Sequence, residues 1–347
     1  SVKELLNAGI QPDIIMCRSE RSIDKDSISK ISLFCNVKKD FVIPALNAKS
    51  IYEVPSLYSK HGLDEALLKQ LGYNPKNHKL NLKPWINLQK KIKNKKHEVK
   101  IAVVGKYTNL KDSYKSLNEA LIHGGIENFS EVNIQWINSE KESKLSLIKK
   151  LKGCNGILVP GGFGFRGING KINAIKFARE NNIPFFGICL GMQLAVIEIA
   201  QNVLKIKNAH SSEFKKTSKS VVGLMTEWVN KNKIEKRDKY SNKGGTMRLG
   251  AYKAILKKSS KIYSIYKTKT ISERHRHRYE VNQKFLSRFE NKGYYFSGMS
   301  PDGLLPEVLE SKNHKWFIGV QFHPELKSRP LNPHPLFVSF IKAAKND

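Results

Sequence analysis

The segment from Ile183 to Gln193 places a cysteine on a Gly-x-Cys-x-Gly turn, between a short apolar run and a long apolar helical pattern. This pattern predicts a buried strand, a sharp turn at Cys189 and a helix over residues 190–203. The small neighbours Gly187 and Gly191 permit the strained turn and leave the thiol open to a substrate. The positive helix end would favour a thiolate and offer N–H donors to an oxyanion. We therefore predict an exposed nucleophile at Cys189, with a buried structural cysteine as the alternative.

A second motif supplies a base and an acid. Residues 316–322 read as a buried strand that ends in His323-Pro324-Glu325, where the proline stops strand pairing. Because side chains two residues apart on a strand share one face, Glu325 is expected beside His323. An imidazole oriented by a carboxylate is what a cysteine nucleophile needs. The glycine-rich loop that ends the strand pattern at residues 156–167 could complete an oxyanion hole with its amides.

The same loop matches the dinucleotide fingerprint Gly162-x-Gly164-x-x-Gly167, which we reject. That fingerprint belongs to the first strand-helix unit and needs an acidic residue about twenty positions later. Here Pro160 precedes the glycines, earlier strand-helix units are predicted, and the next strand leads to Cys189. No phosphate-binding Gly-x-x-x-x-Gly-Lys-Ser/Thr loop occurs either, so the sequence predicts no nucleotide-phosphate loop.

These motifs carry a family resemblance. Pro160-Gly-Gly, Gly187 to Gln193 and Phe322-His-Pro-Glu resemble the class I, triad-type glutamine amidotransferases. Longer blocks are similar to the CTP synthases within that group: residues 1–19, 30–37, 50–55, 212–214, 244–251, 273–282 and 300–307. The resemblance implies a flavodoxin-like α/β fold, a mostly parallel sheet flanked by helices, preceded by a remnant of a P-loop-like synthetase domain.

The resemblance also implies roles for individual residues. Cys189, His323 and Glu325 would hydrolyse glutamine through a thioester, and the ammonia would aminate UTP to CTP at a separate site that uses ATP and Mg²⁺. Glu213 would bind the α-amino group of glutamine and Arg278 its α-carboxylate, a pairing that suits a guanidinium fork. The other residues implied in glutamine binding are Gly162, Leu190, Gly191, Met192 and Gln193.

Nucleotide contacts follow from the same resemblance. Lys30 matches a position that contacts UTP or CTP, although an exposed helical lysine is the alternative. Ala48 matches a backbone contact to the adenine of ATP. The loop at residues 163–170, with Arg166, is the expected sensor of the activator GTP. A homotetramer is implied as well.

Composition along the chain predicts three parts: a synthetase remnant at residues 1–75, a Lys- and Asn-rich linker at 76–98, and an amidotransferase domain at 99–347. Strand and helix patterns alternate from residue 99, which favours a mostly parallel sheet covered on both faces. Residues 221–310 read as more β-rich, with added antiparallel strands, and a helix is expected at 336–344. The synthetase phosphate loop and its Mg²⁺ ligands are expected upstream, so the chain is interpreted as a truncated member of the family, able to hydrolyse glutamine but not to make CTP.

Charge and cysteines leave other readings open. The net charge of +31 would suit a nucleic-acid binder, but only eleven of the 61 basic residues are Arg and the lysines are dispersed, so we attribute it mainly to codon bias. His275 and His277 lack a third ligand at metal spacing, and a strand with solvent-facing basic residues is the preferred reading of 274–277. Four cysteines without metal spacing, no 18-residue apolar stretch and no signal peptide predict a soluble, cytoplasmic protein.

Two other functions share the same motifs. A stand-alone thiol glutaminase or γ-glutamyl hydrolase would use the same turn without an ammonia acceptor. A catalytically silent regulatory domain is disfavoured because Cys189, His323 and Glu325 are all present.

Overall fold

The computed structural model describes residues 2–106, 111–215, 219–224, 227–230, 233–236 and 247–345. The chain divides into two compact units, Ser1–Asn94 and Lys95–Asp347. Residues 244–246, which open one of the blocks that resemble CTP synthases, lie outside the described residues.

The first unit is built on two parallel strands, β1 (Ile15–Ser19) and β2 (Val42–Leu46), joined by α2 (Lys25–Cys35). Asp24 caps α2 by accepting a hydrogen bond from the backbone N–H of Ser27 at 2.8 Å. A small apolar core forms between these elements from Val37, Phe41, Val42, Ile43 and Ala66. The other helices of this unit are α1 (Val2–Asn7), α3 (Val54–Lys60), α4 (Leu63–Gln70) and α5 (Lys83–Lys93).

The segment predicted as a linker contains α5, which packs on the first unit. The side-chain amide of Gln89 donates hydrogen bonds to the carbonyl of Tyr52 at 3.2 Å and to the hydroxyl of Ser56 at 3.0 Å. The second unit begins at Lys95, and its first strand begins at His97. The domain boundaries at residues 75 and 98 stay a prediction.

The second unit is organised around a nine-stranded sheet with the order β12-β11-β14-β15-β16-β6-β5-β3-β4. The strands from β16 to β4 are parallel, and those from β12 to β16 pair in antiparallel fashion, as expected for the region before residue 310. The bounds are β3 (His97–Gly105), β4 (Ser130–Asn138), β5 (Gly156–Val159), β6 (Phe185–Ile188), β11 (Arg248–Leu256), β12 (Thr270–His277), β14 (Tyr294–Met299), β15 (Pro306–Ser311) and β16 (Phe317–Val320).

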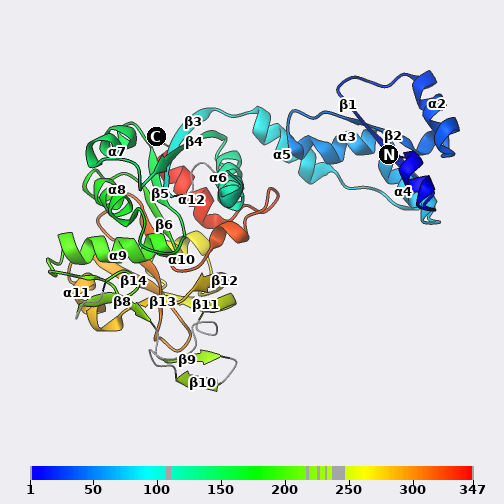
Figure 1. Cartoon of the computed structure of the whole chain (residues 1–347). Coiled ribbons are helices and arrows are strands. Elements are labelled where there is room, and N and C mark those ends of the chain that lie inside the picture. Colours follow the sequence, from blue (N-terminus) through cyan, green and yellow to red (C-terminus); the bar gives the residue numbers. More distant parts are fainter. Residues whose placement is uncertain are drawn as a thin grey trace. The chain divides into compact units, whose positions relative to one another are not determined.

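Helices cover both faces of this sheet (Figure 1). One apolar cluster takes in α7 (Lys144–Leu151), α8 (Ile168–Glu180) and α9 (Leu190–Asn202). The opposite cluster takes in α6 (Lys115–Glu127), α10 (Lys261–Tyr266) and α12 (Pro335–Ala344). Alternate residues of β3 enter the two clusters, because successive side chains of a strand point to opposite faces. The predicted α/β fold with helices on both faces of the sheet is confirmed, and the parallel part of the sheet runs from β16 to β4.

Smaller elements flank the sheet. A three-stranded sheet has the order β13-β8-β7, and β9 pairs with β10 as an antiparallel hairpin. Their bounds, with the remaining helix, are β7 (His210–Ser211), β8 (Ser220–Leu224), β9 (Glu227–Asn230), β10 (Lys233–Lys236), β13 (Tyr279–Val281) and α11 (Leu286–Glu290).

Candidate active site

Cys189 lies at the junction of β6 and α9, with φ of 51° and ψ of −103°. This positive φ is strained for a residue with a side chain. The turn needs glycine on both sides: a Cβ on Gly187 would lie 2.8 Å from the carbonyl carbon of Gly191, and a Cβ on Gly191 would lie 2.1 Å from the carbonyl oxygen of Val159. The sharp strand-to-helix turn predicted from the sequence is therefore present.

The predicted exposure of Cys189 is wrong, because the residue is only 2% exposed and joins an apolar cluster. Its sulfur has two polar neighbours at 3.9 Å, the carbonyl oxygen of Arg276 and the side-chain nitrogen of Gln321. The strained turn brings the thiol to the end of the sheet, but β12 and the segment after β16 cover it. The sequence motif describes the turn and not these distant chain segments.

His323 and Glu325 form the predicted pair, with His323 Nδ1 2.7 Å from Glu325 Oε1. The geometry differs from the expected one: β16 ends at Val320, and residues 324–326 form the 3₁₀ helix η7 (Pro324–Leu326) rather than a strand. The backbone N–H of His323 donates to the carbonyl of Arg274 at 2.8 Å, which ties this loop to β12. Since the carboxylate accepts, Nδ1 carries a proton, and Nε2 is the ring nitrogen that can take the proton of the thiol.

The charge state of His323 responds to the cysteine. Burial lowers the pKa of His323, but the hydrogen bond and charge of a Cys189 thiolate, followed by those of Glu325, raise it to about 10. Nε2 is buried and has no hydrogen-bond partner among the described residues, as is common in a catalytic site before substrate binds. The backbone of Gly161 lies close to both His323 and Cys189: a Cβ at this position would lie 2.6 Å from His323 Cε1 and 3.5 Å from Cys189 Cβ.

A buried lysine that was not predicted from the sequence lies behind the implied oxyanion loop. Lys171, on α8, is 1% exposed, and its Nζ lies 3.9 Å from where a Cβ of Gly162 would be. Burial, and then the nearby charge of Lys106, lower the pKa of Lys171 to about 8. A cation under Gly162 adds positive potential where an oxyanion would form. Its only signal in the sequence is a lysine on the inward face of an amphipathic helix.

The two residues implied as a clamp for the amino acid, Glu213 and Arg278, are both half-buried. The carboxylate of Glu213 accepts a hydrogen bond from the backbone N–H of Gly164 at 3.0 Å. Burial raises the pKa of Glu213, while Gly164, Lys106 and Arg278 lower it. The Nε atom of Arg278 is buried without a hydrogen-bond partner among the described residues, as expected of a group that waits for a ligand. The charges of Glu213 and Arg278 both act on Tyr279, so the clamp residues share one neighbourhood.

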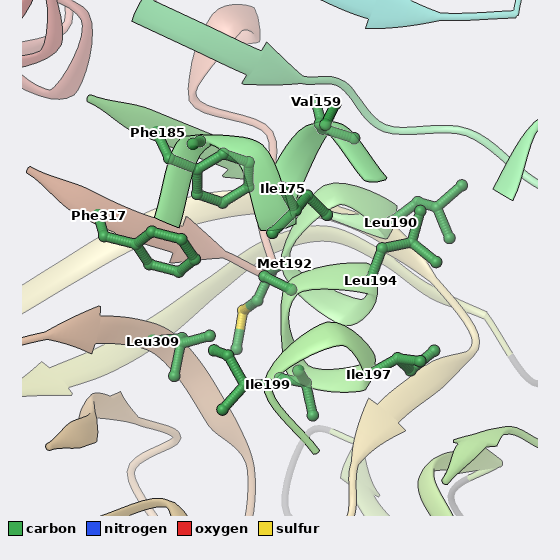
Figure 2. Close-up of a cluster of buried hydrophobic side chains, with 14 of the residues drawn as sticks. Val159, Ile175, Phe185, Leu190, Met192, Leu194, Ile197, Ile199, Leu309 and Phe317 are labelled. Carbon is green, nitrogen blue, oxygen red and sulfur yellow. The ribbon is translucent and has the colours of Figure 1, made fainter. Parts of the chain in front are cut away.

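The residues after Cys189 are buried. Leu190 and Met192 belong to the apolar cluster beneath the sheet, where the Met192 side chain lies near Phe317 and Leu309 (Figure 2). Only backbone amides of this turn could then reach a substrate, because the first N–H groups of a helix have no partner within it. The side-chain amide of Gln193 donates to the carbonyl of Tyr279 at 2.9 Å and to Gln321 Oε1 at 3.2 Å.

The basic strand β12 is only half solvent-facing, contrary to the preferred reading. Arg274 and Arg276 point outward, but His275 and His277 are each 2% exposed and bond to each other at 2.9 Å. Burial, and then the charge of Arg248, hold the pKa of both histidines far below the usual range. The described residues contain no group of three potential ligands suited to a metal ion.

Arg248 stands at the centre of a buried charge network beside these histidines. Its Nη1 atom lies 3.0 Å from Glu280 Oε1 and 2.8 Å from Glu307 Oε1. One guanidinium thus faces two carboxylates. Burial raises the pKa of Glu280 to about 8, with Arg248 lowering it and Glu307 raising it further. The pKa of Glu307 is also raised by burial.

This network predicts a pH-dependent stability. A raised pKa means that the folded state holds a proton that the unfolded chain releases near pH 4.5, so the free energy of unfolding falls as pH rises toward about 8. Glu280→Gln should remove on the order of 2 kcal/mol of that fall, measured by urea denaturation at pH 5 and pH 8. Glu290→Gln, on a partly exposed ion pair with Lys257, is the control and should leave the slope unchanged. An unaltered slope in Glu280→Gln would show that Glu280 is ionised throughout.

The implied nucleotide contacts lie in the first unit. Lys30 is exposed on α2, and Ala48 is half-buried in the loop that follows β2. Ligands of α/β proteins bind beyond the carboxyl ends of parallel strands, and Ala48 occupies such a place.

Both units of the chain are similar to known proteins. A family model for class-I glutamine amidotransferases matches residues 109–343, and one for the CTP synthase N-terminus matches residues 1–73. CTP synthases of Rhizobium johnstonii and Pelagibacter ubique are 57% and 58% identical over 99% and 100% of this chain. The chain spans 63–64% of the length of these relatives.

Structural comparison points the same way. A solved structure described as the glutaminase domain of Trypanosoma brucei CTPS with bound acivicin matches with a TM-score of 0.63 and 38% identity, over 72% of this chain and 95% of that one. Among the described residues, none of the helices has the length and apolar character needed to cross a membrane. The chain belongs to the class-I glutamine amidotransferase family and, within it, to the CTP synthases.

Proposed function

We propose that the second unit hydrolyses glutamine at Cys189. The observation that carries this proposal is the strained turn that sets Cys189 against a histidine already bonded to Glu325 at 2.7 Å. His323 Nε2 takes the thiol proton, and the sulfur attacks the carboxamide carbon of glutamine. The oxyanion forms at the amides of Gly162 and Leu190, with the charge of Lys171 behind the loop.

His323 also carries out the proton transfers in the rest of the catalytic cycle. His323 returns the proton to the leaving nitrogen, so ammonia departs and a thioester remains on Cys189. His323 then removes a proton from a water molecule, which attacks the thioester and releases glutamate. Glu325 holds the imidazole in the required tautomer and stabilises its charged form through both halves.

In the whole protein, the ammonia would aminate UTP to CTP with ATP and Mg²⁺ at a synthetase site, as the names of the relatives suggest. Lys30 and Ala48 are proposed as contacts to UTP or CTP and to ATP. The proposed assembly is a homotetramer with a cytoplasmic location, which suits four free cysteines. The domain boundaries at residues 75 and 98 belong to this proposal.

GTP is the proposed activator, acting on the loop at residues 163–170. This loop borders a cavity of about 510 Å³ that Phe165, Gly167 and Phe214 help to line. Phe163 and Phe165 are 45% and 74% exposed, so the loop has apolar side chains available for a base. Ligand-dependent closure of such a loop would place Gly162 over the substrate.

The direct test is release of glutamate from glutamine by the purified chain, with and without GTP. Slow release that GTP accelerates supports the proposal, and release without any nucleotide effect favours the stand-alone glutaminase. Hydrolysis of γ-glutamyl amides in preference to glutamine would favour a γ-glutamyl hydrolase. No release under any condition would contradict the proposal.

The clamp yields a prediction for substrate binding. Arg278→Ala should raise the KM for glutamine, with about 2–5 kcal/mol of binding free energy lost because the substrate carboxylate loses its charged partner. Arg274→Ala, on the outward face of β12, is the matched control and should keep the wild-type KM. Unchanged kinetics in Arg278→Ala would show that the carboxylate binds elsewhere.

A further inference from the structure

Gln321 is a fully buried side chain, 0% exposed, that contacts the nucleophile without belonging to the triad. Its Nε2 atom lies 3.9 Å from the sulfur of Cys189, within reach of an N–H to sulfur hydrogen bond. The backbone N–H of Gln321 donates to the carbonyl of Glu307 at 2.9 Å, which fixes the segment on β15. The Gln321 side chain is therefore buried on a fixed segment of backbone.

The orientation of its amide follows from a chain of contacts. The carbonyl of Tyr279 can only accept, so the group of Gln193 that faces it at 2.9 Å is the donating nitrogen. That nitrogen also faces Gln321 at 3.2 Å and requires an acceptor there, which is the side-chain oxygen. The remaining end of Gln321, its NH₂ group, must then point at the sulfur.

The second polar neighbour of the sulfur has the opposite character. The carbonyl oxygen of Arg276 lies 3.9 Å from the sulfur and can accept the S–H of a neutral thiol. A thiolate has no hydrogen to give and needs a donor instead, which only Gln321 of these two neighbours supplies. The two neighbours thus match the two protonation states of the cysteine without any rearrangement.

We propose that Gln321 donates an amide N–H to the thiolate of Cys189 and so favours the state that attacks glutamine. This inference rests on the proposed glutaminase function and adds a residue to it. The donor acts on the nucleophile before and after each turnover, whereas the amides near Gly162 act on the oxyanion.

The test compares Gln321→Glu with Gln321→Met. A glutamate side chain at position 321 has the same shape as glutamine and can still accept a hydrogen bond from Gln193, but it places a carboxylate oxygen where the N–H group was. We expect kcat for glutamine to fall at least about tenfold in Gln321→Glu at pH 8, and about threefold in Gln321→Met, with KM changed less than about twofold in both. The defect of Gln321→Glu should shrink toward pH 5.5, because a protonated carboxyl can donate again.

Because an ionised glutamate is itself costly to bury, the free energy of unfolding is measured for both variants: a purely structural role predicts that the loss of kcat follows the loss of stability, whereas loss of the N–H donor lowers kcat in Gln321→Met without a matching loss of stability. An equal or smaller defect in Gln321→Glu at pH 8 would overturn the inference. Gln201→Glu is the matched control. Gln201 lies on the same helix as Gln193, and its side-chain amide donates to the carbonyl of Ala209 at 2.8 Å. This variant should keep the wild-type pH profile.

A readout without glutamine separates this inference from the proposed function. The rate at which iodoacetamide alkylates Cys189, followed by mass spectrometry of its peptide, should be lower in Gln321→Glu at pH 8 than in wild type. If wild type releases no glutamate, the proposed function fails, while the alkylation rates still decide the role of Gln321. Equal alkylation rates in the two proteins would overturn the inference alone.

Discussion

Replacing Cys189 with alanine will abolish glutamine hydrolysis, with a loss of at least about 10⁴-fold in kcat, because no other group can form the thioester. The measurement is glutamate release at saturating glutamine. The fold should survive, because alanine accepts the same backbone turn and removes one buried sulfur atom, at a stability cost of about 1 kcal/mol. The structure revises our expectation here, since the sulfur lies in a buried cluster and its removal has some cost.

Chemical labelling gives an independent check of this assignment. A diazo-ketone analogue of glutamine should leave one adduct, on Cys189, and Cys154→Ala should be labelled like wild type because Cys154 is buried elsewhere in the second unit. Labelling of Cys17, Cys35 or Cys154 with Cys189 unmodified would contradict the nucleophile assignment. Residual activity above one per cent of wild type in Cys189→Ala would contradict it too.

Replacing Arg248 with methionine will destabilise the second unit by about 3–5 kcal/mol at pH 7, because the carboxylate of Glu307 then remains buried without its cation and Glu280, which is protonated at this pH, loses its hydrogen-bond partner. Urea denaturation measures this loss. Arg288→Met, on an exposed position of α11, is the matched control and should change the free energy of unfolding by less than about 0.5 kcal/mol.

Charge and packing can be separated in the same network. Arg248→Met combined with Glu280→Gln and Glu307→Gln should recover part of the lost stability, since the neutral amides are cheaper to bury than carboxylates. A loss below about 1 kcal/mol in Arg248→Met would show that Glu307 is neutral as well as Glu280. A full loss in the triple variant would assign the effect to packing around the guanidinium.

Local patterns in the sequence were sufficient to predict the main elements. The predicted strands near residues 99–104, 132–137 and 157–159 are β3, β4 and β5, and the predicted closing helix is α12. Each of these has an apolar periodicity that its own residues carry. The boundaries moved by a few residues, and the predicted strand geometry of His323 and Glu325 became a short 3₁₀ turn, because backbone at strand ends depends on its neighbours.

The sequence by itself determined which reactive groups lie close together along the chain: a cysteine between two glycines at a strand-to-helix turn, a histidine and glutamate two residues apart, and a glycine loop. These features depend on residues close together in the chain, where bond geometry alone limits the arrangement. Only the tertiary structure decided that Cys189 is buried and that Gln321 faces its sulfur, since these two residues are 132 positions apart. It also turned His275 and His277 inward and placed Lys171 beneath Gly162. Such contacts arise when separate elements pack on one sheet, and no local pattern encodes which side chains then meet.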